Sequence, residues 1–158
     1  MDGLRAAVDA TGEALLLRGR ERRGGVLAVG LAARQADLVV RNIRVLARSA
    51  VAATRLRAAV PPDLVQAVAD LAAAVRLLGD SLVAALEQSP DAPAAARATE
   101  QAALRAVSAA GRSLTPGAHL AVMMVAGQLR AAAVDVLRAN GGDELAVLDQ
   151  VDAALGLG

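Results

Sequence analysis

His119, the only histidine in the chain, has the side chain best suited to metal or acid–base chemistry. A metal site would need carboxylates close by, and the nearest acidic residues in sequence, Glu100 and Asp135, are far along the chain. Helical zinc motifs and the Glu-x-x-His pairs of di-iron bundles are both absent. We therefore predict that His119 lies in the first turn of a helix as a surface or capping residue, and we expect no metal and no cofactor.

Other catalytic patterns are also missing. The candidate nucleophiles are Ser49, Ser81, Ser89, Ser108 and Ser113. No base lies near them in sequence, and the G-x-S-x-G turn that exposes a nucleophilic serine does not occur. All basic residues except the histidine are Arg, so lysine Schiff bases and the phosphate-loop lysine are excluded. A site of paired carboxylates stays open, although the acids fall at solvent positions of predicted helices. We expect no enzyme.

Arginine is concentrated in the first part of the chain. Residues 1–60 hold 11 Arg and 5 acidic residues, whereas residues 61–158 hold 6 Arg and 11 acidic residues. One group is Arg18, Arg20, Arg22 and Arg23; a second, Arg34, Arg41, Arg48 and Arg55, recurs every seven residues. The two halves can neutralise each other within one fold, or the basic arm, above all the first group, can face anionic lipid. Nucleic acid is disfavoured as a partner because no aromatic side chain is available to stack on a base.

Polar residues in two otherwise apolar segments form a candidate cluster. They are Arg41, Asn42, Arg44, Gln128, Arg130 and Asp135. Such side chains often form hydrogen bonds across a helical bundle and fix its register. The alternative is a small-anion or regulatory site that uses the same arginines.

Composition predicts the fold class. Of the 158 residues, 56% are hydrophobic, yet Phe, Trp, Tyr and Cys are all absent. Ala favours helices, strands favour aromatic and β-branched residues, and the lack of Cys excludes disulfides and thiolate metal sites. The start has no secretory signal, and the longest uncharged stretch, 113–129, is interrupted by Pro116 and Gly117, so we expect a water-soluble, cytoplasmic chain.

Periodicity and Pro/Gly turns predict an all-α antiparallel bundle of about four main helices plus short terminal helices. The main helices are expected at 26–59, 62–88, 94–110 and 116–139. Residues 1–25 would form a terminal helix (2–18) and an Arg/Gly-rich hinge, 26–142 the bundle, and 143–158 a short last helix.

Several details of these helices are also predicted. The core stripe of 26–59 is expected to be Ala36, Val39, Ile43, Leu46, Ala50 and Ala53; that of 62–88 is Leu64, Val68, Leu71, Val75, Leu78, Leu82 and Leu86. Gly79 is expected to pack closely against a neighbour, because glycine weakens a helix interior. The Ala-dominated helix 94–110 should bury little apolar surface and be the least stable helix of the chain. Thr115 and Pro116 should begin the next helix, which is apolar enough to be central. Asn140, Gly141 and Gly142 should end that helix, and Asp143 and Glu144 should begin the short last one.

Three runs resemble the C-terminal soluble region of bacterial FUSC-type proteins, the fusaric acid resistance and aromatic acid exporter relatives. They are DLVVRNIRVLAR (37–48), VPPDL (60–64) continuing to 79, and VAGQLR (125–130) continuing to 138. The resemblance covers about residues 26–142 and is one of pattern, without a catalytic signature. It implies a helical domain on the cytoplasmic side of the bacterial inner membrane, attached to transmembrane helices that are not in this sequence, with a role in assembly or regulation.

Two functions remain open at this stage. In the first, the chain is the soluble bundle of an exporter, and its partners are a second copy or the upstream membrane part, with an anionic lipid surface as a further partner; exposed apolar seams would favour this function. In the second, the chain is a stand-alone cytosolic module that binds an anion or nucleic acid through its basic half. Salt-dependent binding would favour the second function.

Overall fold

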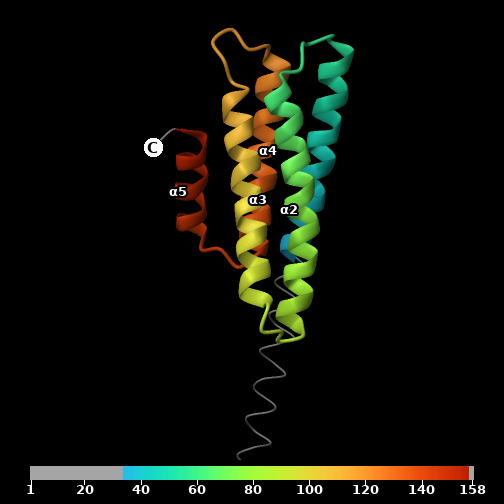
Figure 1. Cartoon of the computed structure of the whole chain (residues 1–158). Helices are drawn as coiled ribbons and strands as arrows, with labels where there is room; N and C mark the ends of the chain where they lie inside the picture. Colours follow the sequence, from blue (N-terminus) through green and yellow to red (C-terminus); the bar gives the residue numbers. More distant parts are fainter. Residues whose placement is uncertain (1–33, 157–158) are drawn as a thin grey trace, which may run out of the picture.

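Four long helices run antiparallel, and a shorter helix packs against their side (Figure 1). The computed structural model describes residues 34–156; residues 34–55 are helical. They are followed by α2 (Pro62–Leu86), α3 (Ala92–Arg112), α4 (Leu120–Ala139) and α5 (Glu144–Leu155). Within 34–156 there is no strand, so the predicted all-α antiparallel bundle is confirmed. The predicted helix 2–18 and the arginines at 18, 20, 22 and 23 lie outside the described residues.

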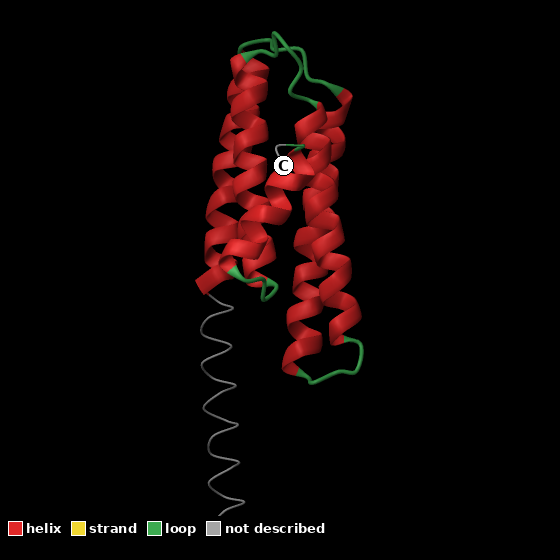
Figure 2. Cartoon of the chain, turned by 90° about the vertical axis from the view of Figure 1, so that its left-hand side faces the viewer, coloured by secondary structure: helices red, strands yellow, loops and turns green. Residues whose placement is uncertain are grey.

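The helices form two layers. The α2–α3 hairpin makes one layer, and α4 with the helix of residues 34–55 makes the other (Figure 2). The turn between α2 and α3 projects beyond the ends of the other layer. Helix α5 lies on the outside, against α3 and α4.

Buried alanines are a shared feature of α2 and α3, which pack against each other. Ala67 and Ala74 of α2 are fully buried, and so are Ala102, Ala106 and Ala110 of α3. The separation of two packed helices depends on the side chains between them, and alanines allow a short separation along the whole pair. Among the contacts that α2, α3, α4 and α5 make with one another, the one between α2 and α3 is accordingly the most extensive.

This close contact shifts the buried face of α2 from the predicted stripe. Leu64, Leu71 and Leu78 are buried as predicted, whereas Val68 and Leu86 are exposed. The positions between the leucines are filled by Ala67, Ala74 and Ser81. The pattern of large apolar residues did not predict these positions, because the sites where two helices approach most closely are occupied by small side chains.

The prediction that the Ala-rich helix buries little was wrong. Helix α3 contacts α2, α4 and α5. Its buried residues are Thr99, Ala102, Ala103, Ala106, Val107, Ala109 and Ala110. An alanine contributes little apolar area by itself, but a helix surrounded by three others buries most of its circumference.

The core stripe of the helix over residues 34–55 is largely as predicted. Val39, Leu46 and Ala53 are buried, Ile43 is packed partly against the core, and Ala50 is exposed, contrary to expectation. The helix ends earlier than the predicted residue 59. Arg57 adopts a left-handed conformation with φ of 52°, and the N–H of Ala58 donates to the carbonyl of Ala53 at 3.1 Å. This is a Schellman end, which stops the helix before the prolines are reached.

Helix α4 begins four residues after the predicted start. Gly117 has φ of 82°, and the N–H of Ala118 donates to the carbonyl of Thr115 at 2.9 Å, so this segment is a turn. The capping residue is His119, whose Nδ1 accepts the N–H of Ala121 at 3.1 Å. The prediction that His119 is a surface or capping residue is therefore confirmed, while the expected cap at Thr115 was wrong.

The link between α4 and α5 follows the predicted stop. Gly141 has φ of 95°, and the N–H of Gly142 donates to the carbonyl of Leu137 at 3.0 Å, which completes a second Schellman end. Asp143 then caps α5 by accepting the N–H groups of Leu145 and Ala146 at 3.1 and 3.2 Å. Helix α5 buries Val147 and Val151 against the bundle.

Gly79 does not pack closely against a neighbour, contrary to the prediction. It is exposed, and a Cβ atom built on it would have no atom within 4 Å. Gly142 is the opposite case, because its Cβ would lie 2.5 Å from Val147 Cγ2 and 2.9 Å from the carbonyl oxygen of Leu137.

We expect Gly79→Ala to raise the free energy of unfolding by about 0.5–1 kcal/mol, because alanine restricts the unfolded chain and fits the open space. Gly142→Ala is the matched control and should destabilise the fold through its steric clash. Urea unfolding followed by circular dichroism measures both. A loss of stability in Gly79→Ala would show that this glycine has a packing role.

Candidate functional site

The buried carboxylate of Asp135 is the polar centre of α4. Every residue from 132 to 137 of α4 is buried, and Asp135 is only 8% exposed. The Nδ2 atom of Asn42 donates to Asp135 Oδ2 at 2.5 Å and thereby joins the helix of residues 34–55 to α4. A hydrogen bond to a charged group is among the stronger ones, and its loss would leave the carboxylate unsatisfied.

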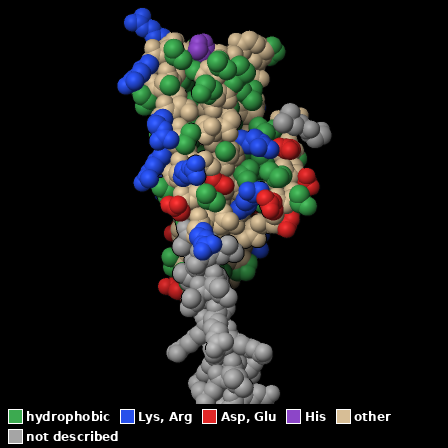
Figure 3. Space-filling model, turned by 180° about the vertical axis from the view of Figure 1, so that it is seen from behind, with side chains coloured by type: hydrophobic (Ala, Val, Ile, Leu, Met, Phe, Trp, Pro, Cys, Tyr) green, Lys and Arg blue, Asp and Glu red, His purple; other side chains and the backbone are tan. Residues whose placement is uncertain are grey.

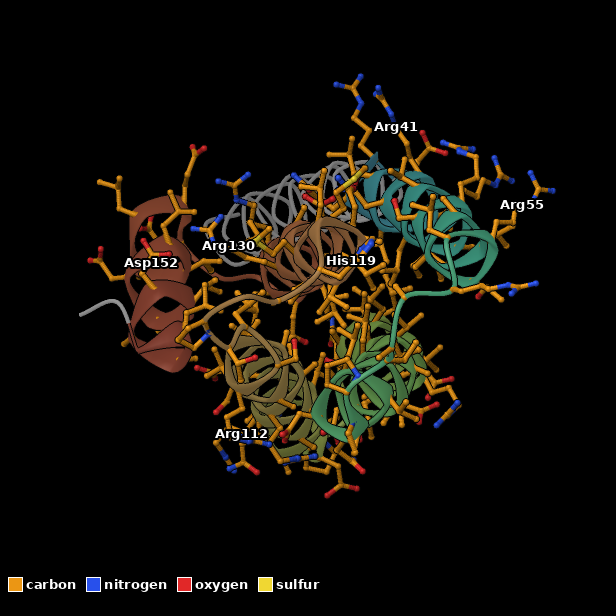
Figure 4. All side chains as sticks on the ribbon, turned by 90° about the horizontal axis from the view of Figure 1, so that it is seen from above. Arg41, Arg55, Arg112, His119, Arg130 and Asp152 are labelled. Atoms are coloured by element: carbon orange, nitrogen blue, oxygen red, sulfur yellow. The ribbon has the colours of Figure 1, made fainter. Side chains whose placement is uncertain are left out.

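The other members of the predicted cluster lie elsewhere. Arg41 and Arg44 are exposed, and Figure 4 shows Arg41 pointing away from the bundle. Arg130 projects toward α5, where its Nη2 lies 2.6 Å from Asp152 Oδ1 (Figure 4). Gln128 is half-buried on α4. Successive helical residues are about 100° apart around the axis, so neighbours such as Arg41 and Asn42 face different directions.

A second polar bridge was not predicted. The hydroxyl of Ser81 on α2 donates to Asn140 Oδ1 at 2.9 Å, and Asn140 Nδ2 donates to the carbonyl of Ala96 on α3 at 2.8 Å. One side chain at the end of α4 thus ties three helices together. The sequence marked Asn140 only as part of a helix stop; its position before two glycines predicts the turn but not the partners.

These groups do not form a catalytic arrangement. Among residues 34–156, no three His, Asp or Glu side chains come together as metal ligands do. His119 is exposed, and its Nδ1 is engaged in the helix cap. The polar residues that the structure joins connect one helix to another, and Asn140 connects three helices, which is a structural arrangement.

Open cavities lie on the surface of residues 34–156, and two of them adjoin α4. One, of about 280 Å³, lies between α3, the end of α4 and α5, with Arg97, Glu100, Asn140 and Asp143 among its lining residues. The other, of about 270 Å³, has a mostly apolar lining that includes Met123, Gly127, Arg130 and Leu155. The second cavity adjoins the exposed face of α4.

We call this exposed face of α4 the α4 seam. Its members are Leu120, Met123, Met124, Gly127 and, half-buried, Ala131. Leu120 is 65% exposed, Met123 46% and Met124 54%. Apart from the adjacent pair Met123 and Met124, successive members recur at the three- or four-residue spacing of one helix face. The C-terminal half of α4 is therefore central, as predicted, whereas its N-terminal half buries one face and has an apolar face that no residue of the range 34–156 covers.

The arginines that recur every seven residues form a second exposed surface, the arginine face. Arg34, Arg41, Arg48 and Arg55 are all exposed. Arg41 and Arg55 extend outward from the bundle in Figure 4, and basic side chains follow the same edge in Figure 3. Because Val39, Leu46 and Ala53 face the core, the heptad spacing places these arginines on the opposite side of the helix.

No family model, curated protein or solved structure matches this chain. Among the described helices, α4 alone has the length and apolar composition to cross a membrane, and 61% of its most apolar window is buried in the bundle. Core helices of soluble proteins have the same properties, so α4 is weak evidence for a membrane span.

Removal of the Asn42 amide should destabilise the fold. We expect Asn42→Ala to lower the free energy of unfolding by about 1.5–3 kcal/mol, because the Asp135 carboxylate loses its hydrogen-bond donor. The double variant Asn42→Leu with Asp135→Leu should recover most of this loss, since no buried charge remains. A double-mutant cycle measured by urea unfolding separates the pair from its surroundings; strictly additive effects would contradict the coupling.

Proposed function

We propose that this chain is the soluble helical domain of a membrane efflux protein of the FUSC or aromatic acid exporter type. In this proposal it lies on the cytoplasmic side of the bacterial inner membrane and serves assembly or regulation, with no chemistry of its own. The family part rests on the three sequence runs described above. The assembly part rests on one observation, the α4 seam.

The partner that we propose for the α4 seam is a second copy of the chain. The seam is straight, lies on one helix and contains Gly127, where a Cβ atom would have no atom within 4 Å. A glycine in an apolar face lets a partner helix approach closely. A symmetric pair, in which the same face of each copy covers the other, is the commonest arrangement in homo-oligomers.

The size of the seam sets the expected strength of this association. Leu120, Met123 and Met124 together expose an area on the order of a few hundred Å², below the roughly 800 Å² per partner of a standard stable interface. The isolated chain should therefore associate weakly. Attachment to a membrane part would raise the effective concentration of the seams and strengthen the same contact.

One observation favours the alternative function, a stand-alone cytosolic module that binds an anion or nucleic acid. The arginine face is exposed, and none of its arginines forms an ion pair with a residue in the range 34–156. Such a module would need no second copy and no membrane part.

The DNA upstream of Met1 tests the exporter part directly. We expect the same reading frame to encode several apolar segments of about 20 residues, because this length spans a bilayer. A stop codon and a ribosome-binding site immediately before Met1 would contradict the exporter part and leave the stand-alone module as the leading function.

Sedimentation equilibrium tests the assembly part. We expect a monomer–dimer equilibrium with a dissociation constant on the order of 0.1–1 mM. The double variant Met123→Glu with Met124→Glu should remain monomeric, because it would bury charge in the contact. The matched control, Val83→Glu with Leu145→Glu, changes two exposed apolar residues away from the seam and should dimerise normally. A wild-type chain that stays monomeric at about 1 mM, or a control that loses the dimer equally, would contradict the proposal.

A further inference from the structure

The arginine face continues beyond its heptad positions. Arg44 lies on the same side of the helix, and Arg57 follows the helix end, so residues 34–57 carry six arginines and a single acid, Asp37. From Arg34 to Arg55 the face extends about 32 Å along the helix, at 1.5 Å per residue. All six arginines are exposed.

The positive charge of this face is not neutralised within the described part of the chain. The four ion pairs among residues 34–156 use Arg105, Arg112, Arg130 and Arg138, and none uses an arginine of the 34–57 segment. The first interpretation of the charge asymmetry, that the basic and acidic halves neutralise each other within one fold, finds no support in ion pairs of these arginines among residues 34–156. Within that range, no acidic side chain competes through an ion pair with an external anion for these arginines.

The rest of the described chain has the opposite charge. Residues 58–156 hold 6 Arg and 11 acidic residues. Seen from behind, basic side chains follow the upper part of one edge of the molecule; acidic side chains lie over α5 on the other side, and others lie at the lower part of the basic edge (Figure 3). A molecule with this charge separation is oriented by an extended anionic surface, which attracts one side and repels the other.

Apolar residues beside the arginines distinguish between anionic partners. Val40 and Val51 are exposed, and their helical positions place them next to Arg44 and Arg48. A phosphate backbone offers such side chains little, whereas the boundary between headgroups and acyl chains of a bilayer accepts them. No aromatic side chain is present to stack on a base.

From these observations we propose that the arginine face, with Val40 and Val51, docks on the anionic phospholipid surface of a bilayer. The guanidinium groups bind lipid phosphates through paired hydrogen bonds, and the two valines enter the headgroup region. The helix then lies parallel to the membrane plane, and the acidic α5 side of the molecule faces away from it. This inference concerns a different face from the α4 seam and requires neither a second copy nor an upstream membrane segment.

Vesicle co-sedimentation of the full chain tests the proposal. The probes are phosphatidylcholine vesicles with and without about one-third phosphatidylglycerol, at low salt and at about 0.5 M NaCl, where surface charges are strongly screened. We expect binding only to the anionic vesicles at low salt. The triple variant Arg41→Gln, Arg48→Gln, Arg55→Gln should bind roughly 100-fold more weakly, since each arginine near the surface contributes about a factor of five.

The matched control is the triple variant Arg76→Gln, Arg97→Gln, Arg105→Gln, which removes the same charge from exposed positions on α2 and α3. It should retain binding, and circular dichroism should show that both triple variants are folded. Equal loss in the control would overturn the proposal, because net charge alone would then explain binding. Two other results would also overturn the proposal. One is a loss of vesicle binding that occurs only when Arg18, Arg20, Arg22 and Arg23 are replaced; the other is a wild-type chain that does not bind.

A second comparison separates lipid from nucleic acid. Val40→Ser with Val51→Ser should weaken vesicle binding severalfold and leave the weak, salt-sensitive binding of a DNA duplex unchanged. Duplex binding that is tighter than vesicle binding at the same salt would overturn the membrane assignment. Self-association is measured without lipid, so failure at the arginine face and failure at the α4 seam are recorded independently.

Discussion

The close packing of alanine between helices is the constraint on which the rest of this structure depends. The chain has no aromatic side chain, so no large ring fills space between its helices. Ala67 and Ala74 of α2 against the alanines of α3 bring the two backbones together instead, and α3 in turn supports α4 and α5. Small side chains also provide little apolar area each, so stability requires many short contacts along long helices.

Close alanine packing constrains the distance between two helices more than it constrains their register, because similar small side chains repeat along each helix. Two polar bridges supply the missing specificity. Asn42 binds the Asp135 carboxylate between the helix of residues 34–55 and α4, and Asn140 links α4 to Ser81 and Ala96. A buried polar group is costly unless its partner is in place, so a shifted register would lose both bridges. Helix α4 thus combines the most extensively buried segment with the groups that align it.

The same helix has two different halves, and this difference supports an interaction role for the domain. Residues 132–137 are buried on all sides, whereas Leu120, Met123 and Met124 face outward. The arginine face lies on the adjacent helix of the same layer. An apolar seam and a basic face on one layer give the domain two separate exposed surfaces, for which we propose a second copy and an anionic bilayer as the partners.

The sequence by itself determined the fold class, the approximate helices and most of the turns. These features follow from local signals: alanine content, the positions of Pro and Gly, and the heptad spacing. For this reason the sequence could predict the helix stop at Asn140–Gly141–Gly142, the helix start at Asp143 and the separation of the heptad arginines from the core stripe. Contacts between distant residues could not be predicted. Periodicity cannot show which small residues contact a neighbouring helix. The buried surface of α3 was therefore predicted too low, and Gly79 was given a packing role that it lacks. Likewise, the six candidate polar residues share two helices, but only the packing of those helices decided that Asn42 meets Asp135 and that Arg41 and Arg44 remain in solvent. The packing of α5 on α4 decided that Arg130 meets Asp152. The physical reason is that direction around a helix follows from the sequence, whereas the partner in that direction depends on how the helices are arranged.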